Sequence, residues 1–280
     1  MAAAAVSAAD AACVARVPAL LEALRKGFLV LRGGDKSDDE DDDDSDDDDD
    51  DDDDVVVARS HELQKILAGE PNAPAHPAAL AALLSAGLVP LLLSLCTTEA
   101  RAKTCQEVCR ALLSALRVSE AARDQVGLAG FCQLLDVAER DASSVHIATV
   151  VLSWTSISTT MMTAVCGEVG TPTLQRVLVL CDRSASTAAF TTLRYLLSDA
   201  ALAQSAIQGL FNNGFVAWLA KHLRHFFLIA PDAALVIILL HVCHSLLATR
   251  DGREAMRLLY HHFGDCAILS VTSPCRGSCC

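Results

Sequence analysis

From residue 78 onward, hydrophobic positions form shorter and longer helical patterns. A recurring sequence lies between successive helical patterns and marks a turn. A glycine followed by an apolar cluster occurs at Gly87, Gly130, Gly170 and Gly214, at intervals of 43, 40 and 44 residues. A looser fifth copy begins at Gly264, 50 residues further on. Self-similarity at such a period predicts stacked helical units, none of which can bury its apolar face without a neighbour.

Each predicted unit has the same internal order. A short helix, as at Ala78–Ala86 or Ala203–Asn212, precedes the glycine, which permits a sharp turn into a second helix. A loop follows, and then a longer helix that is apolar nearly all round, as a helix packed between neighbouring units needs to be. The long helices are expected at Lys103–Leu116, Ser144–Ile157, Thr187–Leu197 and Ala233–Leu247.

Two further helical patterns precede the repeats. Val14–Leu31 has apolar residues at helical spacing and is stopped by Gly33 and Gly34. A second helical pattern begins near Val55 and ends at Gly69. Glu70–Pro77 contains three prolines and is expected to be a loop, because proline disfavours helix in the residue before it.

Charge is distributed very unevenly along the chain. The formal net charge of the 280 residues is -13, with 22 basic and 35 acidic side chains, but Asp38–Asp54 is acidic throughout except for Ser45. Outside this acidic tract the basic and acidic side chains nearly balance. The tract is expected to be disordered, because adjacent carboxylates repel and no apolar surface is available to bury. A near-neutral folded part also excludes a basic nucleic-acid-binding domain.

The repeated motif resembles armadillo repeats, with Gly87-Leu88-Val89-Pro90-Leu91-Leu92 and Gly214-Phe215-Val216-Ala217-Trp218-Leu219 as examples. This resemblance implies an all-α fold, a right-handed α-solenoid of about four repeats, and the function of a non-catalytic scaffold that binds protein partners along a groove. The predicted organisation is an N-terminal helical segment at 1–34, the disordered acidic tract at 35–54, a helix and proline-rich loop at 55–77, the repeat domain at 78–270 and a cysteine-rich flexible tail at 271–280.

Two alternatives concern the partner. About four repeats with flanking helices also resemble the Hsp70-binding nucleotide exchange factors, so a co-chaperone that opens Hsp70 is a second hypothesis. A third hypothesis is that the acidic tract itself binds basic proteins. Importin-like and catenin-like members carry an Asn ladder on the groove helices, and its absence from Val151-Leu152-Ser153-Trp154 and the matching stretches argues against nuclear-localisation peptides as ligands.

Polar or aromatic residues on the long apolar helices are the candidates for partner binding, because they differ from their neighbours. They are Arg110, Trp154, Arg194, Tyr195, His241 and His244. Truncating Trp154 or Tyr195 to Ala is expected to weaken partner binding without unfolding the protein.

No metal site, cofactor site or catalytic site is expected. His241, Cys243 and His244, with His261 nearby, match no standard zinc cassette. Cys105 and Cys109, one helical turn apart, are most simply core residues. No hydrolase elbow, phosphate loop or zincin motif is present, so the protein is not expected to be an enzyme.

The cysteines and the absence of a signal peptide predict a reducing, intracellular location, cytoplasmic or also nuclear. The uncharged stretch Ala142–Gly167 and the apolar stretch Phe226–Ala248 are better explained by burial than by a membrane. The chain ends in Cys279 and Cys280, whose palmitoylation would add a membrane anchor, although an unmodified tail is the simpler interpretation.

Overall fold

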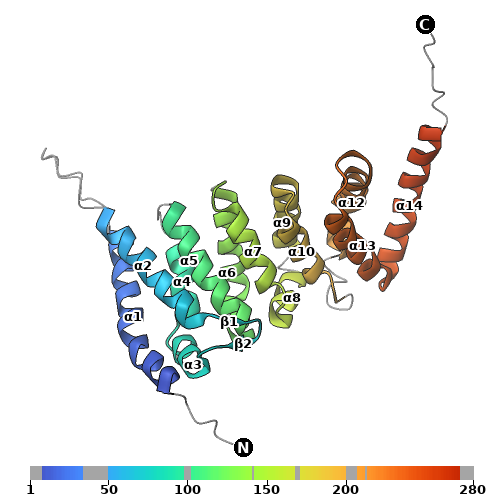
Figure 1. The fold of residues 1–280 in the computed structure, drawn as a ribbon. Helices are drawn as coiled ribbons and strands as arrows, with labels where there is room; N and C mark the ends of the chain where they lie inside the picture. The colour runs from blue at the N-terminus through green and yellow to red at the C-terminus, as the bar shows by residue number, and fades with distance from the viewer. Residues whose placement is uncertain are drawn as a thin grey trace, which may run out of the picture. The chain divides into compact units, whose positions relative to one another are not determined.

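The computed structural model describes residues 8–33, 50–97, 102–140, 142–167, 171–199, 207–211 and 213–271, with the backbone alone at 30–33, 50–53, 73, 97, 171 and 262–271. The fold is all-α, as predicted, and one short antiparallel hairpin interrupts the helices (Figure 1). The helices are α1 (Ala8–Gly33), α2 (Asp50–Leu67), α3 (Pro77–Ser85), α4 (Leu88–Thr97), α5 (Ala102–Val118), α6 (Glu120–Arg140), α7 (Val145–Thr155), α8 (Thr159–Cys166), α9 (Thr171–Ser184), α10 (Thr187–Leu196), α12 (Phe215–Arg224), the π-helix η2 (His225–Ile229), α13 (Ala233–Leu247) and α14 (Arg250–Val271). The strands are β1 (Gly69–Glu70) and β2 (Ala73–Pro74).

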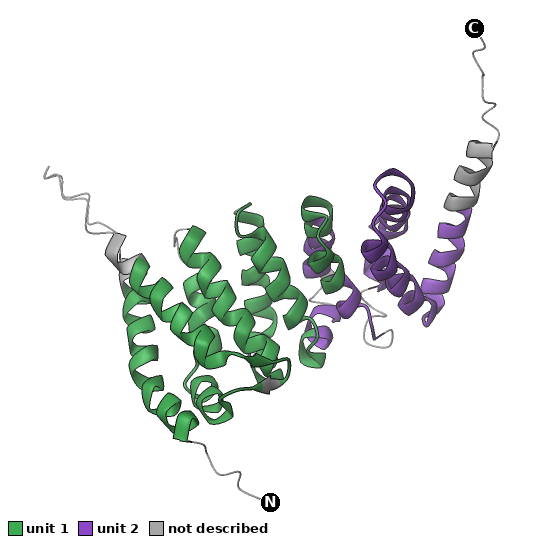
Figure 2. Cartoon of the chain, in the orientation of Figure 1, with its two compact units in different colours: residues 1–161, 180–192 green, residues 162–179, 193–280 purple. Residues whose placement is uncertain are grey.

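The chain divides into two compact units (Figure 2). Unit 1 comprises residues 1–161 and 180–192, and unit 2 comprises 162–179 and 193–280. Within unit 1 the helices before residue 77 pack on later ones, since α1 packs on α3 and α2 packs on α5.

Unit 1 has two layers of helices. The long helices α2, α5 and α7 pack side by side in one layer, and α1, α4 and α6 cover them as the other. Leu112 and Leu116 of α5 are fully buried between the two layers, as are Phe131 and Leu135 of α6. The predicted long helix at Lys103–Leu116 is therefore confirmed, and its neighbours supply the cover that its composition requires.

Unit 2 has its C-terminal core between α12, α13 and α14. Helix α12 packs on α13, α14 and η2, and α13 also packs on η2 and α14. Phe215 and Leu219 of α12 and Leu239 and Val242 of α13 are buried there. Helix α13 has the bounds that the sequence predicts, Ala233–Leu247. Its start is fixed by Asp232, whose carboxylate accepts hydrogen bonds from the first-turn amides.

Two of the predicted glycine turns are confirmed. Gly87 and Gly214 have φ of 85° and 80°, lie between consecutive helices, and have no atoms near the position of a Cβ. The left-handed backbone, rather than lack of space, is therefore what requires glycine at these two turns.

The other predicted glycine turns differ. Gly130 lies inside α6, where its missing side chain makes room for Leu93, and the sharp bend is instead at Gly127, with φ of 61°. The prediction of a turn at Gly130 was therefore wrong by three residues. Gly264 lies within the continuous helix α14, so the fifth copy has no turn there. Gly170 is outside the described residues.

Part of the acidic tract that the sequence predicts to be disordered is helical. Helix α2 begins at Asp50 rather than near Val55, so the last five aspartates are helical. Negative side chains at a helix N-terminus are stabilised by the helix dipole, which explains why the helix extends into the tract. Asp38–Asp49 lie outside the described residues.

Candidate functional site

The outward face of helix α13 is apolar, although it is exposed to solvent. Ile237, Leu240 and Leu247 are 55%, 49% and 46% exposed, and His241 and His244 are exposed between them. At 3.6 residues per turn these five positions fall on one face of the helix. We call these five residues the α13 stripe. The opposite face carries the buried Leu239 and Leu246, so α13 is apolar on both sides and covered on only one.

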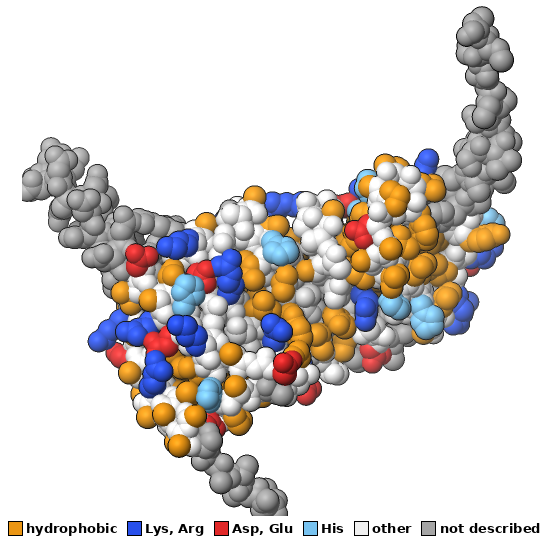
Figure 3. Space-filling model, viewed as in Figure 1, with side chains coloured by type: hydrophobic (Ala, Val, Ile, Leu, Met, Phe, Trp, Pro, Cys, Tyr) orange, Lys and Arg blue, Asp and Glu red, His pale blue; other side chains and the backbone are white. Residues whose placement is uncertain are grey.

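Further exposed apolar side chains lie on the two elements that pack against α13, namely η2 and α14. They are Phe227, Leu228 and Ile229 of η2 and Leu258 and Tyr260 of α14. Within the described part of the chain, eight of the eleven large hydrophobic residues that are exposed lie between 227 and 260. Figure 3 shows hydrophobic side chains gathered over the part of unit 2 that holds α12 and α13. Exposed apolar groups in such a cluster, unlike single ones, mark an interaction surface.

The predicted residues of unit 2 fall in two places. His241 and His244 belong to the α13 stripe, whereas Arg194 and Tyr195 are half-buried on α10, where the Arg194 guanidinium lies 5.1 Å from the centre of the Tyr195 ring. Cys243 is buried on the face of α13 opposite to His241 and His244. These three side chains therefore do not converge on one point.

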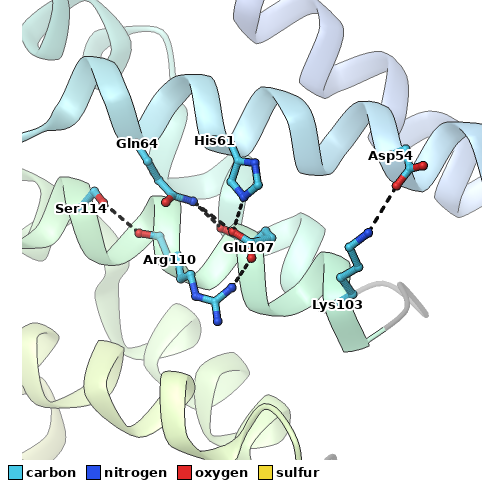
Figure 4. A network of polar contacts seen from close by, with 7 residues as sticks. All are labelled: Asp54, His61, Gln64, Lys103, Glu107, Arg110 and Ser114. Atoms are coloured by element: carbon cyan, nitrogen blue, oxygen red, sulfur yellow. Dashed lines mark hydrogen bonds and ion pairs between the residues drawn. The ribbon is translucent and has the colours of Figure 1, made fainter.

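Arg110 belongs to a polar network that joins α2 to α5 (Figure 4). The network centres on the carboxylate of Glu107, which is almost buried. The Arg110 guanidinium donates to it, the amide of Gln64 donates to it at 3.3 Å, and His61 Nε2 lies 2.9 Å from it. The charge of Arg110 is thus paired within unit 1, although about half of its side chain remains exposed. The network holds the packing of α2 on α5 and leaves Arg110 a weaker candidate for a partner contact.

Trp154 covers a buried cation. Arg123 of α6 is 5% exposed, and its guanidinium lies 5.6 Å from the centre of the Trp154 ring. Its Nε donates to the carbonyl of Leu116 at 2.7 Å, and its Nη2 donates to the carbonyl of Arg117 at 3.3 Å and to the side chain of Asn72. The half-buried indole therefore lies against a group that holds unit 1 together.

The structure changes the expected result of truncating Trp154. Trp154→Ala removes a cation–π partner and leaves space beside Arg123, so we expect the free energy of unfolding to fall by about 2 kcal/mol. Urea unfolding followed by helical circular dichroism measures this, with Trp154→Phe as the control that keeps an aromatic face. An unchanged midpoint for Trp154→Ala would show that the ring serves only partner binding, as the sequence suggested.

Three cysteines of unit 1 meet in the core, at the end of α4 and in the first two turns of α5. The Sγ atoms of Cys96, Cys105 and Cys109 all lie within 4.8 Å of one another, and those of Cys96 and Cys109 are 3.6 Å apart. All three residues are buried and are free thiols. The prediction that Cys105 and Cys109 are core residues is confirmed, and the sequence did not predict that Cys96 lies beside them.

The three thiols differ in acidity. The pKa of Cys105 is lowered because Cys109, and then Cys96, donate hydrogen bonds to its sulfur, and the charge of Arg140 adds to this effect. The pKa values of Cys96 and Cys109 are raised because both donate hydrogen bonds to Cys105 and because burial disfavours the thiolate. The hydrogen bonds from the two neighbouring thiols therefore favour the thiolate form of Cys105.

Several predicted positions have no described side chain. The tail with Cys279 and Cys280 lies outside the described residues. His261 is exposed on α14.

Comparisons with known proteins bear on the fold alone. No family model and no curated protein matches the sequence. Among solved structures, the chain is similar to the crystal structure of an engineered protein from the Northeast Structural Genomics Consortium, with 18% identity and a TM-score of 0.55, over 84% of this chain and 88% of that one. The class that these observations define is that of all-α proteins.

No single helix in the described part of the chain is both long and apolar enough to cross a membrane. Two bent pairs pass that test of length and composition when taken together, namely α3 with α4 and α7 with α8. The second pair lies within Ala142–Gly167, the uncharged stretch that the sequence analysis compared with a membrane segment.

Proposed function

We propose that this protein is a non-catalytic protein-interaction scaffold, an armadillo-like right-handed α-solenoid that binds a protein partner on the α13 stripe. The observation that carries the proposal is the uncovered apolar face of α13. A helix that is hydrophobic all round is normally enclosed, and α13 is enclosed on one side only.

The stripe has the composition of an interface centre. Its three aliphatic side chains are about half exposed, and covering each of them would contribute on the order of 1 kcal/mol from apolar burial. Phe227 of η2 and Tyr260 of α14, the two elements that pack against α13, are exposed aromatic side chains of the kind that act as anchors in interfaces. The outward face of α13 carries no charged side chain, and His241 and His244 offer hydrogen bonds. This surface fits the apolar face of a partner helix.

Two features support the solenoid part of the proposal. The glycine motif recurs along the sequence, and Gly87 and Gly214 adopt the same left-handed turn. In unit 1, the long helices α2, α5 and α7 succeed one another as neighbours in one layer. Stacking of like elements in sequence order is typical of repeat proteins.

Affinity capture from cell extract with four forms of the purified protein tests the proposal. The forms are the wild type, Ile237→Glu/Leu240→Glu, a form with Asp38–Asp49 changed to asparagine and Glu40 to glutamine, and Val179→Glu. The neutralised tract stops before Asp50 so that α2 keeps its first turn. Val179 is also an exposed aliphatic residue of unit 2, but it lies outside the α13 stripe, so it is the matched control.

We expect proteins that are retained by the wild type, the neutralised form and Val179→Glu but lost from the stripe variant. Hsp70 among these proteins, together with faster ADP release from it, would make the scaffold a nucleotide exchange factor. If the captured proteins depend on the acidic tract and not on the α13 stripe, the proposal is overturned in favour of binding to basic proteins through the tract.

A further inference from the structure

Cys96, Cys105 and Cys109 form a compact set of sulfur donors that the proposed scaffold function does not use. Two of them are one turn apart on α5, and the third lies in the last turn of α4, which packs against α5. We propose that these three cysteines bind one soft, thiophilic metal ion in three-coordinate geometry, with Cu(I) as the best match.

The separations of the sulfur atoms fit such an ion. A metal ion about 2.3 Å from each of three thiolates in one plane needs sulfur atoms about 4.0 Å apart, taking the length of a zinc–sulfur bond as a guide. The three Sγ atoms lie within 4.8 Å of one another, and one pair is at 3.6 Å. Side-chain shifts of less than about 1 Å would therefore complete the site without moving either helix.

The donor set selects the class of metal. Thiolates favour Cu(I) and zinc over hard cations such as magnesium or calcium. Zinc is almost always four-coordinate in structural sites, and in the described part of the chain the cluster contains three ligands and no fourth. A buried site with three sulfur ligands therefore suits a monovalent soft ion such as Cu(I) better than it suits zinc.

The surroundings favour the negative charge that the ligands acquire when they release their protons to solvent on binding. Cys105 lies in the first turn of α5, near the positive end of the helix dipole. Arg140 of α6 donates a hydrogen bond to the carbonyl of Cys96 at 3.1 Å, which places a cation beside the cluster. Both features partly offset the charge of a thiolate-bound ion.

An anaerobic titration of the full chain with Cu(I), in competition with a chromogenic Cu(I) chelator, tests the proposal. We expect one ion per chain and a loss of affinity of at least about a hundredfold in Cys105→Ser and in Cys109→Ser, because even outer-shell partners of a ligand are worth about ten- to a hundredfold. Cys181→Ser is the control, since Cys181 is also a fully buried free thiol of unit 1 and lies outside the cluster. Equal affinities in all four proteins, or no one-to-one complex, would overturn the proposal.

Copper X-ray absorption of the wild-type complex keeps the test independent of whether the variants fold. Three sulfur scatterers around the metal are the expected result. A first shell of nitrogen and oxygen would overturn the proposal, because it would place the ion on histidines or carboxylates elsewhere in the chain.

Discussion

Replacing Ile237 and Leu240 by glutamate is expected to weaken partner binding by at least about a hundredfold. Both side chains belong to the N-terminal half of the α13 stripe, and a few apolar contacts of this kind carry most of the energy of an interface. The substitution removes two apolar contacts and also requires two carboxylates to be desolvated against an apolar partner, which costs several kcal/mol unless they are paired. A titration of the captured partner against wild type and variant measures the loss.

The fold should survive this change, because both positions already face solvent. Surface substitutions of this kind usually alter stability by no more than about 0.5 kcal/mol, so the urea midpoint should stay close to that of Val179→Glu. If the double variant binds as tightly as Val179→Glu, the stripe is not the interface. If light scattering shows a wild-type dimer that the double variant converts to a monomer, the partner is a second copy of this chain.

Replacing Arg123 by alanine is expected to destabilise the protein by about 3 kcal/mol. Its guanidinium satisfies the carbonyls of Leu116 and Arg117 in the last turn of α5, which have no partner within their own helix. It also bonds to Asn72 in the β1–β2 turn and lies against Trp154 of α7. Removing it takes this donor from the buried carbonyl of Leu116, whereas the carbonyl of Arg117 keeps the backbone amide of Asn72 at 2.9 Å. A buried acceptor left without a donor costs about 1–3 kcal/mol, and the lost packing against Trp154 adds to this cost. Urea unfolding of the purified variant measures this loss in the free energy of unfolding.

Arg110→Ala is the matched control for Arg123→Ala. It removes the same type of side chain from the same unit, but Arg110 is about half exposed, and Glu107 keeps the hydrogen bond from Gln64 and the contact with His61 when Arg110 is removed. Exposed ion pairs contribute about 0–1 kcal/mol, so this variant should unfold near the wild-type midpoint. Equal losses in the two variants would contradict a special role for Arg123. A double-mutant cycle that combines Arg123→Ala with Asn72→Ala isolates the contribution of the hydrogen bond between Arg123 and Asn72.

The helices were predictable from the sequence because periodic apolar positions and caps are local signals. Helix α13 has its predicted bounds, since Asp232 caps its start and the apolar run ends with it. The bend in α6 was not predictable to the residue. Gly127 and Gly130 are three positions apart and both can turn the chain, and the choice depends on Leu93, which fills the space beside Gly130 in the folded unit.

The candidate site was predictable only in part. His241 and His244 stood out as polar residues on an apolar helix, but the stripe around them was hidden, because a sequence pattern shows that α13 is apolar and not which neighbours it has. The role of Trp154 depended on Arg123, 31 positions away, and no local pattern joins the two. The cysteine cluster had a partial signal in the one-turn spacing of Cys105 and Cys109, whereas Cys96 joins them through the packing of α4 on α5.

Site-directed photocrosslinking tests most directly whether a partner covers the α13 stripe. A benzophenone side chain is introduced at Leu240 in one form of the protein and at Val179 in another, and each is irradiated in cell extract. We predict one strong adduct with a partner protein from position 240 and none of that mass from position 179. Adducts of equal strength from both positions, or none from position 240 when the partner is retained, would contradict the assignment of α13 as the binding surface.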